Sequence, residues 1–193
     1  MKPYNLIYDA VERKHLLNDE PVPSVTEVIP KQDYYVSPER LEECRQEGED
    51  NHDLIKMYWL SGETFNNPML VAFDEWIWEN SKKLGTIVMF EKPIASLKYK
   101  YCGRPDMLFQ KAVVDMKRSP GNPMFHALQT AGYNRMAVEN EAIPKTKIHL
   151  IVWYDGTEIK SRNVYNDTAE SVFLALVKKW HIDRAVQNYF KEK

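Results

Sequence analysis

Residues 103–119 read GRPDMLFQKAVVDMKRS, and charged side chains interrupt their two apolar stretches. Asp115 and Lys117 are two residues apart, so in a strand they share one face. If PDMLFQ and AVVDMK pair as a hairpin, Asp106 lies close to Asp115, and two carboxylates repel unless a proton or a cation lies between them. Burying unpaired charge is costly. A divalent metal would resolve the repulsion, and oxygen ligands suit Mg²⁺ or Mn²⁺.

The same residues also have a purely structural interpretation. Asp115 and Lys117 could form a buried ion pair in which the two charges neutralise each other and have no further role. A short motif of this kind often occurs without function. The other motifs of the chain therefore decide between the two.

Length and composition indicate an ordinary globular protein. The chain has 193 residues, 44% hydrophobic and 28% charged, which is enough to bury a core. We expect a single domain over residues 1–193. Within it, residues 1–85 form an N-terminal hairpin and a helical elaboration, and residues 86–193 form a sheet with its flanking helices.

Several protein classes are disfavoured. No apolar run is long enough to span a membrane and no signal peptide is recognisable, so we expect a cytoplasmic protein without a membrane partner. Cys44 and Cys102 are too few for a disulfide framework or a four-cysteine metal site. The net charge of −2 argues against nucleic-acid binding through bulk basicity, although a local basic groove is compatible with it.

The first half of the chain predicts short strands and then two helices. Residues 5–11 and 22–29 read as strands. Ser37 and Asn67 each precede a proline, a combination typical of helix starts, and Gly85 ends the second helix. The first helix has about six turns, and its inward face carries residues at steps of three and four: Leu41, Cys44, Gly48, His52, Ile55 and Trp59.

After Gly85 the apolar pattern changes to the period of strands. Four runs with tight connections predict an antiparallel meander: residues 86–94, 95–103, 105–110 and 111–117. The remaining elements are a helix over 123–141, strands over 147–154 and 158–165, and a helix over 168–189. This order predicts an α/β fold with a central mixed sheet that contains an antiparallel meander and is flanked by helices.

Pro105-Asp106 followed by Asp115-Met116-Lys117 resembles the PD-(D/E)XK nuclease superfamily. The chain is similar in particular to the RecB-like nucleases, which include phage-type exonucleases, over roughly residues 22–154. Further motifs occur in the order of that group: PSVTEVI at residues 23–29, Gly48-x-x-x-His52, Glu91, and Gln129-x-x-x-Tyr133. The resemblance implies the restriction-endonuclease-like core of this superfamily.

The resemblance also implies a metal site and catalytic residues. His52, Asp106, Asp115 and the backbone carbonyl of Met116 would hold Mg²⁺ or Mn²⁺, with Lys117 beside the reacting water. The catalytic set would be Asp106, Asp115, Lys117, Glu91, Gln129 and Tyr133.

The residues themselves support two of these assignments. His52 lies on the apolar face of its helix, and the missing side chain of Gly48 would let that helix approach the sheet. Gln129 and Tyr133 are one helical turn apart and project together, either toward the site or into ordinary packing.

The implied activity is a metal-dependent exonuclease acting at linear DNA ends, single- or double-stranded, in recombination, repair or phage replication. The implied location is a bacterial or phage-infected cell, and a homo-oligomer is one form that ring-forming relatives take. Backbone contacts to DNA are expected from Lys98, Arg104, Arg118 and Ser119. Two alternatives stay open: a structure-specific or nicking endonuclease, and a catalytically inactive nucleic-acid-binding protein.

Overall fold

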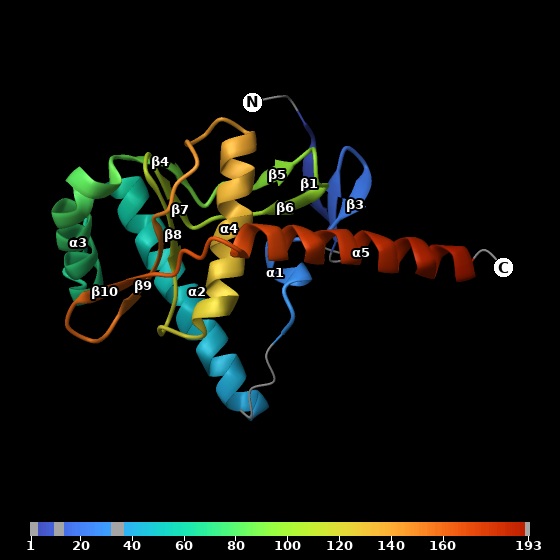
Figure 1. Ribbon diagram of the computed structural model, residues 1–193. Helices are drawn as coiled ribbons and strands as arrows, with labels where there is room; N and C mark the ends of the chain where they lie inside the picture. Colours follow the sequence, from blue (N-terminus) through green and yellow to red (C-terminus); the bar gives the residue numbers. More distant parts are fainter. Residues whose placement is uncertain (1–3, 10–13, 32–36, 192–193) are drawn as a thin grey trace.

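A mixed sheet lies at the centre of the computed structural model, which describes residues 4–9, 14–31 and 37–191 (Figure 1). Within these ranges the sheet has five strands in the order β10-β9-β8-β7-β4, with β8 and β9 parallel and the other neighbours antiparallel. The strands are β4 (Ile87–Phe90), β7 (Met107–Phe109), β8 (Ala112–Met116), β9 (His149–Tyr154) and β10 (Ile159–Asn163). The prediction of an α/β fold with a mixed central sheet is confirmed.

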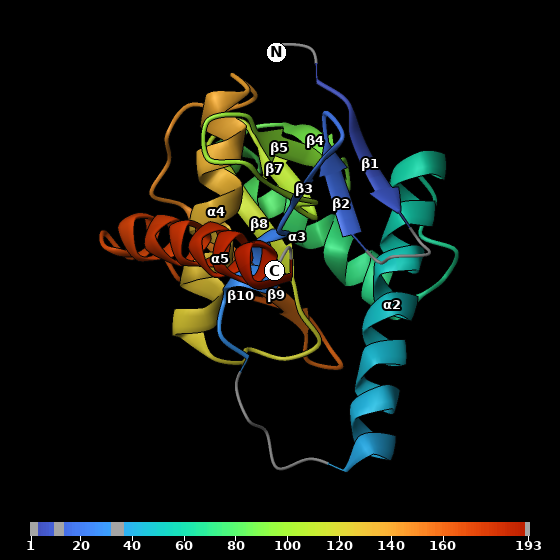
Figure 2. The same cartoon turned by 90° about the vertical axis from the view of Figure 1, so that its right-hand side faces the viewer.

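Helices cover both faces of this sheet (Figure 2). On one face lie α4 (Pro123–Glu139) and α5 (Ala169–Lys191), and on the other lie α2 (Pro38–Ser61) and α3 (Pro68–Leu84). The side chains of β8 alternate between the two layers. Val113 packs in the cluster that contains α4 and α5, whereas Val114 and Met116 pack in the cluster that contains α2 and α3. Asp115 therefore points toward α4.

The helices begin where the sequence predicts. Ser37, Asn67 and Asn122 are N-caps whose side-chain oxygens accept backbone N–H bonds, and a proline follows each. Gly85 caps the end of α3 with a positive φ of 78°. None of the helices in the described ranges has the length and apolarity to cross a membrane.

The N-terminal region differs from the prediction. β1 (Leu6–Asp9), β2 (Lys14–Leu17) and β3 (Glu20–Val22) form a separate antiparallel sheet, and the strand predicted over residues 22–29 is mostly the short helix α1 (Val25–Val28). Ser24 and Glu27 form a capping box, which satisfies the first amides of a helix and outweighs the strand preference of the valines. Residues 10–11 of the first predicted strand lie outside the described residues.

The predicted continuous meander is also wrong. The run 95–103 is divided into β5 (Ile94–Ser96) and β6 (Tyr101–Gly103), which pair in a sheet of their own, and β4 pairs directly with β7. A turn separates β5 from β6. It is fixed by the Ser96 hydroxyl, which accepts from the Tyr99 N–H and donates to Glu139 on α4. This turn removes residues 97–100 from any strand.

The role predicted for Gly48 is wrong as well. A Cβ added at Gly48 would have no neighbour within 4 Å, and Leu41 on the same face is 61% exposed. The first half of α2 extends past the sheet (Figure 1), so the helix packs only from about His52 onward, where Ile55 is buried. The close approach occurs instead at Gly132 on α4, where a Cβ would lie 2.8 Å from the Phe173 ring of α5.

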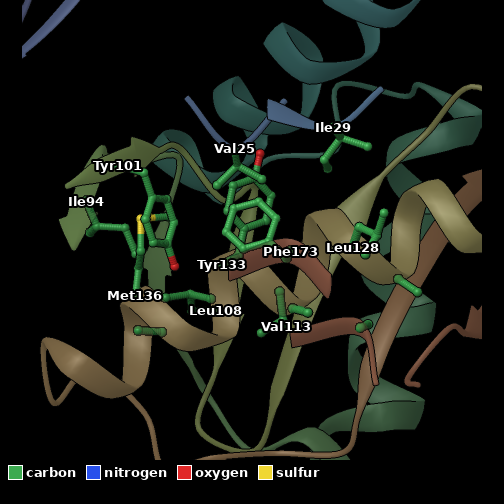
Figure 3. Close-up of a cluster of buried hydrophobic side chains, with 14 of the residues drawn as sticks. Val25, Ile29, Ile94, Tyr101, Leu108, Val113, Leu128, Tyr133, Met136 and Phe173 are labelled. Atoms are coloured by element: carbon green, nitrogen blue, oxygen red, sulfur yellow. The ribbon is translucent and has the colours of Figure 1, made fainter. Parts of the chain in front are cut away.

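The cluster under α4 and α5 holds Tyr133 firmly in place. Figure 3 shows Tyr133 with Val25 and Phe173 in this cluster. A Cβ at Gly103 would lie 2.8 Å from Tyr133 Cε1, so the ring packs directly on the backbone of β6. The side chain is buried and has little freedom to change its position.

Glycine substitutions on the two helices should have opposite effects. Gly48→Ala should raise the free energy of unfolding by about 1 kcal/mol, because alanine is the better helix former and its methyl group meets open space. Gly132→Val should lower it by about 1–3 kcal/mol, because the side chain collides with Phe173. Urea unfolding followed by circular dichroism measures both, and a stabilising effect at position 132 would contradict the packing described.

Candidate active site

Three carboxylates lie side by side at one end of the central sheet. Glu91 follows β4, Asp106 precedes β7 and Asp115 is in β8. The backbone N–H of Glu91 donates to the carbonyl of Asp106 at 2.9 Å, and Met107 pairs with Val114, which places Asp106 opposite Asp115. Because paired strands are about 4.8 Å apart, the three acids converge, although they are 24 residues apart in sequence at most.

Asp106 is the central member and is 9% exposed. Its Oδ2 accepts the backbone N–H of Met116 at 2.6 Å. Burial, and then the charge of Asp115, raise the pKa of Asp106 to about 7, although His52 and Lys117 act in the opposite direction. The carboxylates of Asp106 and Asp115 therefore repel each other, and the neighbouring His52 and Lys117 offset this repulsion only in part.

His52 reaches the carboxylates from α2. Its Nδ1 lies 3.1 Å from Glu91 Oε1 and 3.7 Å from Asp106 Oδ1. Glu91 has a backbone φ of 42°, in the left-handed region that a residue other than glycine rarely adopts, and such strain is concentrated at functional sites. Only the resemblance to the nuclease superfamily singled out Glu91, and the structure brings it into direct contact with His52.

Asp115 and Lys117 form an ion pair at 2.5 Å. Asp115 Oδ2 is buried, and the cation that it faces is the Lys117 ammonium. Burial by itself lowers the pKa of Lys117, but the charges of Asp115 and Asp106 outweigh that effect and the pKa is raised. Lys117 is therefore an ammonium group at neutral pH, which suits charge stabilisation and not proton abstraction.

Gln129 and Tyr133 lie together on the buried side of α4. The Gln129 side-chain amide donates to the Tyr133 hydroxyl at 3.3 Å, and Gln129 Oε1 has no hydrogen-bond partner. Burial, and then the charges of Asp115 and Asp106, raise the pKa of Tyr133 far above its ordinary value. Its hydroxyl thus keeps its proton next to the acids.

A cavity of about 560 Å³ opens over these groups between α2 and the ends of the strands. Cationic side chains in its lining outnumber acidic ones: the cations are Arg45, Lys56, Arg104, Lys117 and Arg118, and the acids are Glu49, Asp53 and Glu91. Arg118 also donates to Glu47 on α2 at 3.1 Å. Arg45 and Lys117 are likewise paired, with Glu49 and Asp115, so Lys56 and Arg104 are the lining cations without an ion pair in the described ranges.

The remaining predicted contacts divide into two groups. Ser119 lines an adjoining cavity of about 390 Å³ together with Lys117 and Arg118. Lys98 is not brought to the site. It lies at the turn between β5 and β6, where its backbone N–H donates to Glu139 near the far end of α4.

The structure adds a residue that the sequence analysis missed. His126 is buried on α4 and lines the adjoining cavity, and its Nδ1 has no hydrogen-bond partner. Its position one turn before Gln129 is the signal that could have revealed it.

The donor set fits a divalent cation in its chemistry. One imidazole and three carboxylates are hard or borderline donors of the kind that Mg²⁺ and Mn²⁺ accept. Asp106 and Asp115 are buried close together, and their mutual repulsion favours a cation between them. In the part of the chain that the structure describes, no three His, Cys, Asp or Glu side chains are already arranged as a metal site. Here His52 contacts Glu91 and Asp115 contacts Lys117.

Comparisons with known proteins add little. A scan against protein-family models found no match, and neither did a search of curated proteins. Among solved structures, the chain is similar to an alkaline exonuclease from Laribacter hongkongensis, at 15% identity and a TM-score of 0.35, over 88% of this chain and 92% of that one.

Removing one buried charge should stabilise the metal-free protein. An acid whose pKa is raised on folding costs stability above its unfolded pKa, and the cost grows as the pH rises from about 4 to about 7. Asp106→Asn should therefore raise the free energy of unfolding at pH 8 by roughly 2–4 kcal/mol. The gain should shrink as the pH falls toward 4, as measured by urea unfolding in EDTA.

Asp19→Asn is the matched control, because Asp19 is an exposed turn residue. It should leave the stability unchanged across the same pH range. A loss of stability in Asp106→Asn at pH 8 would mean that the contacts of Asp106 outweigh its repulsion with Asp115.

Proposed function

We propose that the protein is a metal-dependent nuclease with the PD-(D/E)XK core, which hydrolyses phosphodiester bonds at the ends of DNA. One observation carries the proposal. His52, Glu91, Asp106, Asp115 and Lys117 come from four elements and meet beside a cavity that Lys56, Arg104 and Arg118 also line. A buried ion pair that served only stability would not require the other three groups.

The metal ligands in this proposal are the side chains of His52, Glu91, Asp106 and Asp115 with the backbone carbonyl of Met116. A bound Mg²⁺ or Mn²⁺ would activate a water molecule and neutralise charge on the phosphate. The protein holds the carboxylates ready, because the hairpin register and the Met116 N–H fix Asp106 opposite Asp115.

Lys117 supplies positive charge to the phosphate oxygens as negative charge develops on them. Its raised pKa keeps it protonated for that role. Tyr133 is a neutral hydroxyl next to the acids, and the Gln129 amide holds that hydroxyl from one side. In the proposal these two groups orient Lys117 and the attacking water.

Arg104, Arg118 and Ser119 would bind the DNA backbone around the cavity. Arg104 and Arg118 line it, and Ser119 lines the adjoining one. Such contacts fix the position of the strand without reading its sequence. We therefore infer an enzyme of low sequence specificity, in keeping with a role in recombination, repair or phage replication.

Nuclease assays test this proposal directly. The protein should shorten end-labelled linear DNA in Mg²⁺ or Mn²⁺ and leave closed circular DNA intact. Lys117→Ala should reduce the rate by about 10²–10³-fold, because it removes a charge that stabilises the transition state. Asp115→Asn should abolish cleavage, and Lys178→Ala on the exposed side of α5 is the matched control.

The alternatives correspond to distinct results. Cleavage of closed circles would indicate an endonuclease. DNA binding without cleavage of any substrate would indicate an inactive binding protein. Unchanged cleavage by Asp115→Asn would remove the proposed site from consideration.

Metal binding can be measured without activity. Saturating Mn²⁺ should raise the melting temperature of the protein by about 5 °C or more, because a ligand that binds only the folded state stabilises it. His52→Ala and Asp106→Asn should each lose most of this shift, whereas Asp19→Asn should keep it. An equal shift in all variants would place the metal elsewhere.

A further inference from the structure

A second groove leaves the candidate site on the side of the N-terminal sheet. It has a volume of about 590 Å³, and Glu91 and Arg104 line it as well as the first cavity. On its other wall are Tyr8 and His15, from β1 and β2. The groove therefore adjoins the candidate active site.

Tyr8 and His15 form an aromatic pair between β1 and β2. They are paired residues of β1 and β2, with ring centroids 5.0 Å apart and an interplanar angle of 48°. Tyr8 is 55% exposed. Burial lowers the pKa of His15, although the charge of Glu27 acts in the opposite direction. The pair is thus an uncharged ring surface at neutral pH.

This pair continues a packed face beyond the core. Leu6 and Leu17 lie two residues away on the same strands and pair with each other, so they share the face of Tyr8 and His15. Leu6 and Leu17 pack with Cys102 in a small core cluster, of which Tyr8 and His15 are not members. The aromatic rings therefore extend from the core into the groove instead of filling the core.

The groove offers one guanidinium, that of Arg104, to a phosphate. Arg104 is exposed and forms no ion pair with any carboxylate in the described ranges. The nearby acids are engaged: Glu91 contacts His52, and Glu27 accepts from Trp180 Nε1 and caps α1. An available guanidinium beside exposed aromatic rings is the surface on which unpaired bases stack while the backbone is held electrostatically.

We propose that Tyr8 and His15 form a stacking platform for an unpaired base of the strand that leaves the active site. The occupant is single-stranded nucleic acid. In a duplex the bases stack on each other, so no base face is available to stack on Tyr8 or His15. This inference rests on the proposed function, since a nuclease substrate is what would fill both grooves.

Binding to a labelled oligothymidylate in EDTA tests the platform without cleavage. Tyr8→Ala should weaken binding by about tenfold, the order expected for the loss of one base stack. Tyr8→Phe keeps the ring and should bind like the unaltered protein. Trp78→Ala is the matched control, because Trp78 is 79% exposed on α3 and lines neither groove.

An oligonucleotide of the same length with abasic sites separates stacking from charge. The unaltered protein and Tyr8→Ala should bind it equally, because it has no bases to stack. Equal weakening of both oligonucleotides by Tyr8→Ala, no effect on either, or no binding by the unaltered protein would each overturn the platform. Cleavage is measured separately in Mg²⁺. If the protein cleaves DNA but Tyr8→Ala binds the oligothymidylate normally, the platform is rejected and the nuclease proposal stands. If Tyr8→Ala loses binding only to the oligonucleotide with bases but the protein cleaves no DNA, the nuclease proposal is rejected and the platform stands.

Discussion

Asp106 and Asp115 repel each other across the β7–β8 hairpin, and the surrounding structure depends on how that repulsion is compensated. The Met116 N–H holds one carboxylate and the Lys117 ammonium pairs with the other. The compensation is incomplete, because the pKa of Asp106 stays well above its ordinary value. Buried charge of this kind reduces stability, and carboxyl groups with strongly shifted pKa values are concentrated at functional sites in proteins.

The sheet supplies the precision that such a site requires. β8 lies between two helical layers, so one strand presents Asp115 toward α4 and packs Val114 and Met116 under α2 and α3. The crossover from β8 to the parallel strand β9 contains α4, which places Gln129 and Tyr133 on the face of the sheet toward which Asp115 points. Close packing at Gly132 and Gly103 fixes that helix and the Tyr133 ring.

Local patterns in the sequence were sufficient for the helix starts and for the hairpin that opposes Asp106 to Asp115. They failed where the structure depends on distant pairing. Glu91 contacts Asp106 only because β4 pairs with β7, although β5 and β6 lie between them in the sequence. The pattern of apolar residues in a strand does not show which other strand it pairs with. The prediction that Gly48 lets α2 approach the sheet failed for a related reason. The spacing of apolar residues along a helix does not show which part of the helix contacts the sheet. The Tyr8–His15 pair carries no motif at all.

The unusual backbone of Glu91 limits which residues can serve at that position. Glycine would relax the positive φ and remove the carboxylate, whereas aspartate and asparagine tolerate this conformation better than glutamate does. Their side chains are one carbon shorter, however, and the 3.1 Å contact with the imidazole on α2 needs the full reach of glutamate. Glycine, asparagine or aspartate would therefore fit the backbone at position 91 better, but glutamate is the residue that connects α2 to the sheet through His52.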